Sequence, residues 1–247
     1  MPKQPAHLKG RNDRMEYRCV ATSVEGFVQQ LAVAYITHGY WFYVAGEIPE
    51  GKDPAAVDAK LIDQYGIAIT KWARCRRKKQ GLANMQYLRH ERFFVLLATK
   101  GRHEFFQRER VSFCDVRRVP IKFAGYSIGC RKGRDGRWHA AVRVETRTYA
   151  DMRAFVVGAA ILPGDHIFAR ALRELSFEPY AGVRRQLLTA LRKGNRARKI
   201  AGRATLSHEV LRLRRRPSRP FSSQCGAPKL SAEREVFELP MWRRETS

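Results

Sequence analysis

The chain has 247 residues, of which 44% are hydrophobic and 11% aromatic, enough to bury a core as one large or two small domains. Its 48 Lys and Arg residues outnumber its 23 Asp and Glu residues and give a formal net charge of +25, which indicates a polyanionic partner: DNA, RNA or an acidic protein. The start does not resemble a signal peptide, and the most apolar run, residues 154–162, is shorter than the roughly 20 residues that span a bilayer. We therefore expect a soluble, cytoplasmic protein without membrane contact, located at the nucleoid if the partner is DNA.

The five cysteines are spread along the chain without a Cys-x-x-Cys pair or a short Cys/His spacing. This distribution indicates neither a disulfide framework nor a zinc site. We expect the thiols to be reduced, as is usual in the cytosol.

The first part of the chain predicts a basic arm, a helix and a strand. Residues 1–18 are polar and lack the apolar periodicity that could offset their ordering entropy, so we expect them to be flexible. Thr22 begins a capping box, and the apolar spacing behind it predicts a helix to about His38 that ends near Gly39. The aromatic run Tyr40–Gly46 predicts a strand buried on both faces, although its aromatics could also stack on bases.

Two further helices are predicted from their caps. Asp53 fits an N-cap because Pro54 follows at the first helical position. Thr70 caps a second helix at Lys71–Gln80, which carries six cations and no acid. The helix dipole accounts for only part of this charge, so we predict contact with phosphates. Trp72 either anchors this helix to the core or offers a stacking face to a base.

The middle of the chain predicts antiparallel strands. Residues 84–88 and 93–99 form two of them, and the second is apolar enough to be central. A further strand is expected within residues 111–118 and another at residues 121–128. A glycine-rich turn ending in Asp-Gly joins the latter to residues 138–145, and its cationic tip either contacts nucleic acid or lies in solvent.

Two apolar helices are predicted beyond this hairpin. The first carries an apolar stripe over residues 152–159 and is broken at Pro163 and Gly164. Asp165 is the expected N-cap of the second, whose stripe covers residues 167–175.

The densest charge follows at residues 181–219, which hold thirteen Lys or Arg and one acid. Val183, Leu187 and Leu191 are spaced by four and predict a long amphipathic helix with cations opposite. A shorter helix is predicted over residues 207–216. The pair resembles a helix-turn-helix in outline, but the arginines at the C-terminal end of the second helix favour contact with the backbone over reading of bases.

Together these elements predict an α+β fold, with a mainly antiparallel sheet of about five or six strands flanked by helices and an arginine-rich helical C-terminal extension. Four regions are expected: a flexible basic arm at residues 1–18, an α+β core domain at 19–178, a basic helical extension packed on the core at 179–219 and a flexible tail at 220–247.

The clustered cations predict a protein that binds the phosphate backbone of DNA or RNA with weak or no base specificity. The residues predicted to contact nucleic acid are Lys71, Arg74, Arg76, Arg77, Lys78, Lys79, Arg131, Lys132, Arg134, Arg185, Arg192, Arg196, Lys199, Arg212, Arg214, Arg215 and Arg216.

A second function stays open, because the order of a strand, helices and several antiparallel strands resembles that of replication-initiator and transposase endonucleases. This resemblance implies a tyrosine nucleophile, a divalent metal held by a His-x-His pair, with Mg²⁺ or Mn²⁺ as the cofactor, and an origin on a plasmid or mobile element. The sequence has no His-x-His pair, and its nearest substitutes are His90 and His103. Tyr180, just before the basic helix, is the candidate nucleophile, and Asp115 is a candidate carboxylate ligand.

Overall fold

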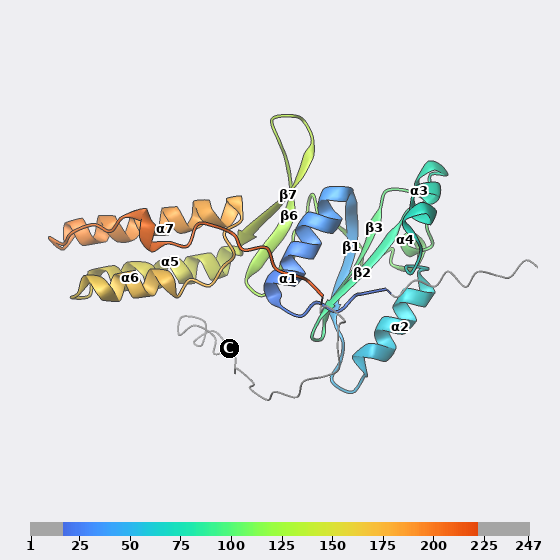
Figure 1. Ribbon diagram of the computed structural model, residues 1–247, viewed down its shortest axis with the longest axis horizontal. Helices are drawn as coiled ribbons and strands as arrows, with labels where there is room; N and C mark the ends of the chain where they lie inside the picture. The colour runs from blue at the N-terminus through green and yellow to red at the C-terminus, as the bar shows by residue number, and fades with distance from the viewer. Residues whose placement is uncertain (1–16, 222–247) are drawn as a thin grey trace, which may run out of the picture. The chain divides into compact units, whose positions relative to one another are not determined.

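The computed structural model describes residues 17–221 and has the predicted α+β fold class. Within this range it contains seven α-helices and two antiparallel sheets of four and three strands, flanked by helices (Figure 1), so the strands do not form the single sheet that was expected. The described residues divide into two compact units: unit 1 comprises residues 17–20 and 39–113, and unit 2 comprises residues 21–38 and 114–221. The predicted tail and most of the predicted arm lie outside the described residues.

Three antiparallel strands belong to unit 1: β1 (Tyr40–Glu47), β2 (Met85–His90) and β3 (Phe93–Thr99). As expected from its apolar run, β3 is central, since it pairs with both β1 and β2, and its residues 95–98 are buried. The expectation that β1 is buried on both faces is wrong. Its second half carries small and charged side chains, and Ala45 and Glu47 are exposed.

The helices of unit 1 are α2 (Pro54–Gln64), α3 (Lys71–Lys79) and α4 (Phe105–Arg108). Both predicted caps are confirmed. The carboxylate of Asp53 accepts hydrogen bonds from the backbone N–H groups of Ala55 and Ala56 at 3.1 Å each. The hydroxyl of Thr70 accepts from the N–H of Ala73 at 3.2 Å. The cationic helix α3 therefore begins where the sequence places it.

The strand expected within residues 111–118 is reduced to the two-residue β4 (Cys114–Asp115). The chain closes a turn after α4 instead, because the N–H groups of Ser112 and Phe113 both donate to the carbonyl of Glu109. Val111 is 98% exposed at this turn, so its β-branched side chain is not evidence of a strand here.

Unit 2 begins with a helix that changes its winding. It comprises α1 (Val24–Gln29), the π-helix η1 (Gln30–Tyr35) and the 3₁₀-helix η2 (Ile36–His38), so its predicted end is confirmed. The predicted capping residue is wrong: Ser23 caps the helix by accepting from the N–H of Gly26 at 3.0 Å, while the N–H of Thr22 donates to the carbonyl of Pro220.

The three-stranded sheet lies in unit 2 and consists of β5 (Ile121–Phe123), β6 (Tyr126–Lys132) and β7 (Trp138–Val144). The hairpin from β6 to β7 is confirmed. Residues 121–128, however, are not one strand. Ala124 and Gly125 have φ angles of 46° and 75°, which makes a two-residue hairpin turn, so that Ile121 pairs with Ile128. An alanine with positive φ is uncommon, and the sequence therefore gave no clear turn signal.

Three helices complete unit 2: α5 (Thr146–Ile161), α6 (Asp165–Arg173) and α7 (Ala181–Ile200). Figure 1 shows α7 lying alongside α5 and α6. The prediction that Asp165 is the N-cap of α6 is wrong. Gly164 takes that position, and Asp165 forms an ion pair with Arg198 of α7. Within residues 17–221, no helix combines the length and apolar composition that a membrane crossing requires.

The second helix of the predicted helix-turn-helix is absent. Residues 207–216 contain only the 3₁₀ turn η3 (His208–Val210), and the following segment runs back toward α1. Leu211 is buried, and Ser218 exchanges hydrogen bonds with the side chain of Gln29 at 2.7 and 3.1 Å. These tertiary contacts, and the prolines that follow, outweigh the helical propensity of this stretch.

Candidate nucleic-acid interface

The long helix α7 has a buried face and a cationic face, as predicted. Val183, Leu187 and Leu191 are buried, and at 20 residues the helix is about 30 Å long. None of the exposed cations along it forms an ion pair with a carboxylate of residues 17–221. These cations are Arg184, Arg185, Arg192, Lys193, Arg196 and Lys199.

At the N-terminal end of α7 lies a cavity of about 390 Å³, all of whose lining residues belong to unit 2. The β6–β7 pairing builds one wall: Arg131 lies opposite His139 and Ser127 opposite Arg143, which places the two arginines and the histidine on one face of the hairpin. The apolar floor is made by η1 and β7. The floor residues are Ala32, Val33 and Ala141; Ala140 and Val142 also line the cavity but lie on the opposite face of β7 from Arg143.

The position of α7 over β7 depends on a glycine and a glutamine. A Cβ at Gly182 would lie 2.4 Å from the carbonyl oxygen of Val142, so a larger residue would push the helix off the strand. Gln186 accepts from the N–H of Val144 at 2.8 Å and donates to the carbonyl of the same residue at 3.0 Å. These contacts hold Arg185, between the two, at the cavity.

The cavity brings cations together without any carboxylate among its lining residues. Four arginines contribute: Arg131, Arg143, Arg185 and Arg215. Burial, followed by the charges of Arg131 and Arg185, lowers the pKa of Arg143. A guanidinium stays charged at any physiological pH, so the lowered pKa reports burial and, after it, repulsion that no carboxylate of residues 17–221 compensates.

Tyr180 and Arg215 form one side of the cavity. The guanidinium carbon of Arg215 lies 4.9 Å from the centre of the Tyr180 ring, in a cation–π arrangement. Burial, only partly offset by Arg215, raises the pKa of Tyr180 to about 12. At neutral pH the phenol is therefore protonated and can donate a hydrogen bond to an anion.

His139 at the rim has an acidic neighbour on the hairpin tip. Its Nε2 lies 3.0 Å from both carboxylate oxygens of Asp135. The hydrogen bond from His139 lowers the pKa of Asp135. The tip residues Lys132 and Arg134 are exposed.

Two further hollows extend the cationic surface along unit 2. One is lined by Arg184, Arg214 and Arg215 and shares Tyr180 with the main cavity. The other lies near the far end of α7. Its lining residues are Arg192, Asn195, Arg196, Lys199 and Thr205.

Two arginines of the same region are already neutralised. Arg198 is fully buried against Asp165, and Arg212 pairs with the buried carboxylate of Glu178 at 2.5 Å. The backbone N–H of Arg216 also donates to Glu178. Arg212, although predicted to contact phosphate, therefore has a structural partner.

The helix α3 presents a second cationic surface, in unit 1. Lys71, Arg76, Lys78 and Lys79 are exposed, and no residue of α3 forms an ion pair within residues 17–221. Trp72 is 76% exposed, so it does not anchor the helix to the core and is free to stack. The half-buried members of this predicted set are Arg74 and Arg77.

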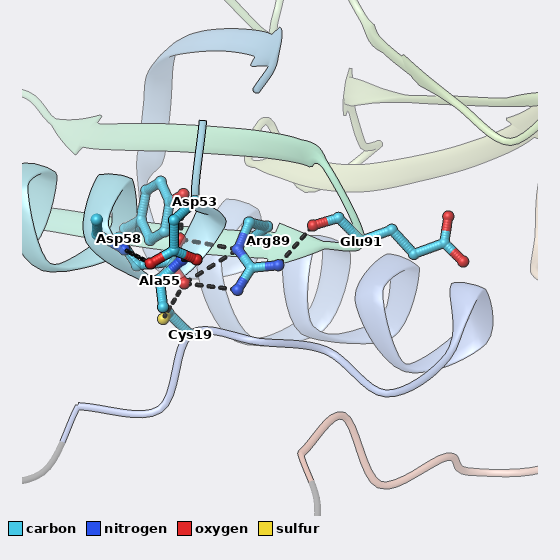
Figure 2. A network of polar contacts seen from close by, with 8 residues as sticks. Cys19, Asp53, Ala55, Asp58, Arg89 and Glu91 are labelled. Carbon is cyan, nitrogen blue, oxygen red and sulfur yellow. Dashed lines mark hydrogen bonds and ion pairs between the residues drawn. The ribbon is translucent and has the colours of Figure 1, made fainter. Parts of the chain in front are cut away.

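In contrast, an ion pair that the sequence did not predict is buried in unit 1. The carboxylate of Asp58 on α2 accepts bonds from Nε and Nη2 of Arg89 on β2 at 2.7 to 3.0 Å, and from the hydroxyl of Tyr87 at 2.7 Å (Figure 2). The Cys19 thiol lies 3.8 Å from Asp58, and burial raises its pKa to about 12. Such a thiol is unreactive, which indicates a structural network.

The predicted catalytic residues fall in different units. His90 ends β2 in unit 1, whereas Asp115 and Tyr180 belong to unit 2. Burial alone would raise the pKa of Asp115, but hydrogen bonds from Arg117, as short as 2.6 Å, outweigh it and lower the pKa. Of the three, only Tyr180 lines the cationic cavity. Residues 17–221 contain no group of three His, Cys, Asp or Glu side chains arranged to hold a metal.

The sequence did not identify Arg143, Gly182 or Val33 as parts of a site. The alternation along β7 placed Arg143 on the same face as His139, but nothing in the sequence brings that face to the start of α7. Comparisons with protein-family models, curated proteins and solved structures found no match to this chain.

Proposed function

We propose that the protein binds the phosphate backbone of DNA or RNA through the cationic face of α7 and the cavity at its N-terminal end. The observation that carries this proposal is the row of exposed cations that lack carboxylate partners in residues 17–221, together with a cavity lined by four arginines and no acid. Lys and Arg that neutralise phosphates release counterions, which supplies most of the affinity of non-specific binding.

Weak base specificity is part of the proposal. A helix-turn-helix reads bases with its second helix, and residues 207–216 do not form one. The exposed cations lie along the side of α7, where contacts to phosphates position a strand without reading its sequence.

The test is a titration of affinity against salt concentration for three labelled probes. They are a duplex of about 20 base pairs (two helical turns), the corresponding single strand, and an RNA hairpin. The logarithm of affinity should fall steeply and linearly with the logarithm of salt concentration. Replacing Arg192, Arg196 and Lys199 together by Gln should lower the slope by about three, one for each phosphate contact. Absence of binding at low salt, or binding to an acidic protein alone, would contradict the proposal.

Arg170 on α6 provides a matched control. It is exposed like the residues of the triple variant, but its Nε donates to Glu174 at 2.9 Å, so its charge is already compensated. Replacing Arg170 by Gln should leave the salt slope unchanged. An equal loss from this variant would mean that net charge, and not the α7 face, governs binding.

The strand-cleaving alternative has one observation in its favour: Tyr180 lines the cationic cavity. Its raised pKa disfavours the phenolate that a nucleophile requires, and the described residues offer no built metal site. Cleavage of labelled strands with Mg²⁺ or Mn²⁺ that is lost in Tyr180→Phe would establish it. A cytoplasmic or nucleoid location and an origin on a plasmid or mobile element belong to the proposal and need localisation and genome-context data.

A further inference from the structure

We infer that the cavity at the start of α7 takes one unpaired nucleotide of the bound strand, with its phosphate among the arginines and its base on the apolar floor. This inference rests on the proposed function and deepens it: it assigns single-stranded or frayed segments as the preferred substrate. Four structural observations support it.

The first observation is the concentration of like charge in the cavity. Arg143 is half-buried, and after burial itself the charges of Arg131 and Arg185, which are exposed, lower its pKa. Neither neighbour forms an ion pair within residues 17–221. Three guanidinium groups that repel one another, without a carboxylate of the described residues among them, suit a multiply charged oxyanion, and the fork of an arginine matches phosphate oxygens.

The second observation is the size and floor of the cavity. Its volume of about 390 Å³ exceeds what a phosphate group needs and falls in the range of small-ligand sites, about 300 to 1,000 Å³. The floor residues from η1 and β7 are two alanines and a valine, whose side chains offer neither a charge nor a hydrogen bond to an inorganic ion. A planar base attached to the phosphate would cover this apolar surface.

The third observation is the stacked pair at the side of the cavity. Arg215 lies over the ring of Tyr180, so a guanidinium group and an aromatic ring come together at the side of the cavity. Aromatic rings and arginine planes of this kind stack on bases without selecting among them. The protonated phenol of Tyr180 adds a donor for the sugar or phosphate.

The fourth observation is the π-helix η1. Its wide turn is supported by the hydroxyl of Thr37, which donates to the carbonyl of Ala32 at 2.8 Å. Ala32, Val33 and Thr37 all line the cavity. A π-turn is rare and is found most often at functional sites. Here it builds the floor against which a base would lie.

A paired base cannot reach this floor, because its faces and its Watson–Crick edge are already occupied in the duplex. Moving it into the cavity requires unpairing and unstacking, which is least unfavourable in single strands and at ends. The inference therefore predicts that the wild-type protein binds a single strand at least about tenfold more tightly than a blunt duplex of equal phosphate number, at matched salt.

The decisive variant changes the floor without changing charge. Val33 is 45% exposed on η1, so Val33→Gln should fold, and it replaces the apolar side chain of the floor by a longer polar one. We expect its affinity for the single strand to fall to that for the blunt duplex. Ile161→Gln is the matched control, because Ile161 is 53% exposed at the end of α5 and does not line the cavity. It should behave as wild type in fluorescence anisotropy titrations.

A second measurement uses the wild-type protein and does not depend on the folding of a variant. A free nucleoside 5′-monophosphate should compete with the single strand more strongly than ribose 5-phosphate does, and inorganic phosphate should compete least. Equal competition by all three would overturn the inference, because it would leave the apolar floor without a role.

The outcomes separate the two proposals. If the wild type binds duplex and single strand equally, or if Val33→Gln keeps the single-strand preference, the nucleotide site is refuted while backbone binding stands. If the wild type binds neither probe, the proposed function itself fails. Loss of the preference in Val33→Gln but not in Ile161→Gln, with the duplex still bound, supports both.

Discussion

Arg89 and Arg143 are the same residue type, and both are shielded from water, but they have opposite surroundings. Arg89 is 9% exposed and donates hydrogen bonds to the Asp58 carboxylate (Figure 2). These hydrogen bonds raise the pKa of Arg89. Arg143 is half-buried, and burial and neighbouring arginines lower its pKa. A buried charge is retained in a fold when it is paired. The two arginines thus differ in whether a carboxylate of residues 17–221 compensates their charge.

The same contrast divides the arginines around α7. Arg198 of α7 pairs with Asp165 of α6 and so connects the two helices. Arg212, in the segment after α7, pairs with Glu178. Arg185, on the same helix as Arg198, has none within residues 17–221. Pairing, and not charge density alone, thus separates the arginines that maintain the fold from those that we assign to binding.

The largest effect is expected from breaking the buried pair. Asp58→Asn keeps the shape of the side chain but leaves Arg89 buried and unpaired, which should lower the free energy of unfolding by about 3–5 kcal/mol. Chemical denaturation measures this change. Glu50→Gln, at an exposed carboxylate of the same unit, should be neutral. A loss below about 1 kcal/mol for Asp58→Asn would show that the pair is not structural.

The next effect concerns the buried face of α7. A Cβ at Gly194 would lie 2.4 Å from the ring of Phe168, which is fully buried and cannot move away easily. Gly194→Ala should lower the free energy of unfolding by about 1–3 kcal/mol. Gly158→Ala on α5 is the matched control, because its Cβ would meet nothing within 4 Å. It should raise stability by about 0.5–1 kcal/mol, and destabilisation there would contradict the argument.

Two arginine variants test the comparison directly. Arg143→Met removes a charge with no carboxylate partner in residues 17–221, so stability should not fall, while the salt slope of nucleic-acid binding should decrease by about one. Arg89→Met removes a paired charge and leaves Asp58 buried alone, so stability should fall. Unfolding curves and salt titrations on both proteins check the two directions. Equal loss of stability in both would remove the distinction between paired and unpaired arginines.

The sequence predicted those features that depend on local signals. The caps at Asp53 and Thr70 and the apolar spacing of α7 gave elements that the structure confirms. The prediction was wrong where tertiary contacts determine the local structure, as in residues 207–216. It was also wrong at Ala124, because an alanine does not indicate a positive φ angle. The α7 cations could be predicted from their periodicity. The cavity could not, because it depends on η1, the β6–β7 hairpin, the start of α7 and Arg215, which are distant in the chain.

The smallest effect is a pH dependence in unit 1. Burial, followed by the charge of Arg77, lowers the pKa of His103 from its usual 6.5. Its Nδ1 accepts a hydrogen bond from the N–H of Phe105 at the start of α4, at 3.1 Å, which requires the unprotonated ring.

The unfolded chain binds this proton more readily than the folded one does. The contribution of His103 is therefore complete above pH 6.5 and is lost as the pH falls below that value toward the lowered pKa. His103→Asn keeps an acceptor at this position but does not titrate. Denaturation of both proteins between about pH 7 and pH 5 should show a steeper loss of stability in the wild type, because only the wild type gains a proton on unfolding. Parallel curves would mean that the histidine is equally free to protonate in both states, and that the bond to Phe105 does not form in solution.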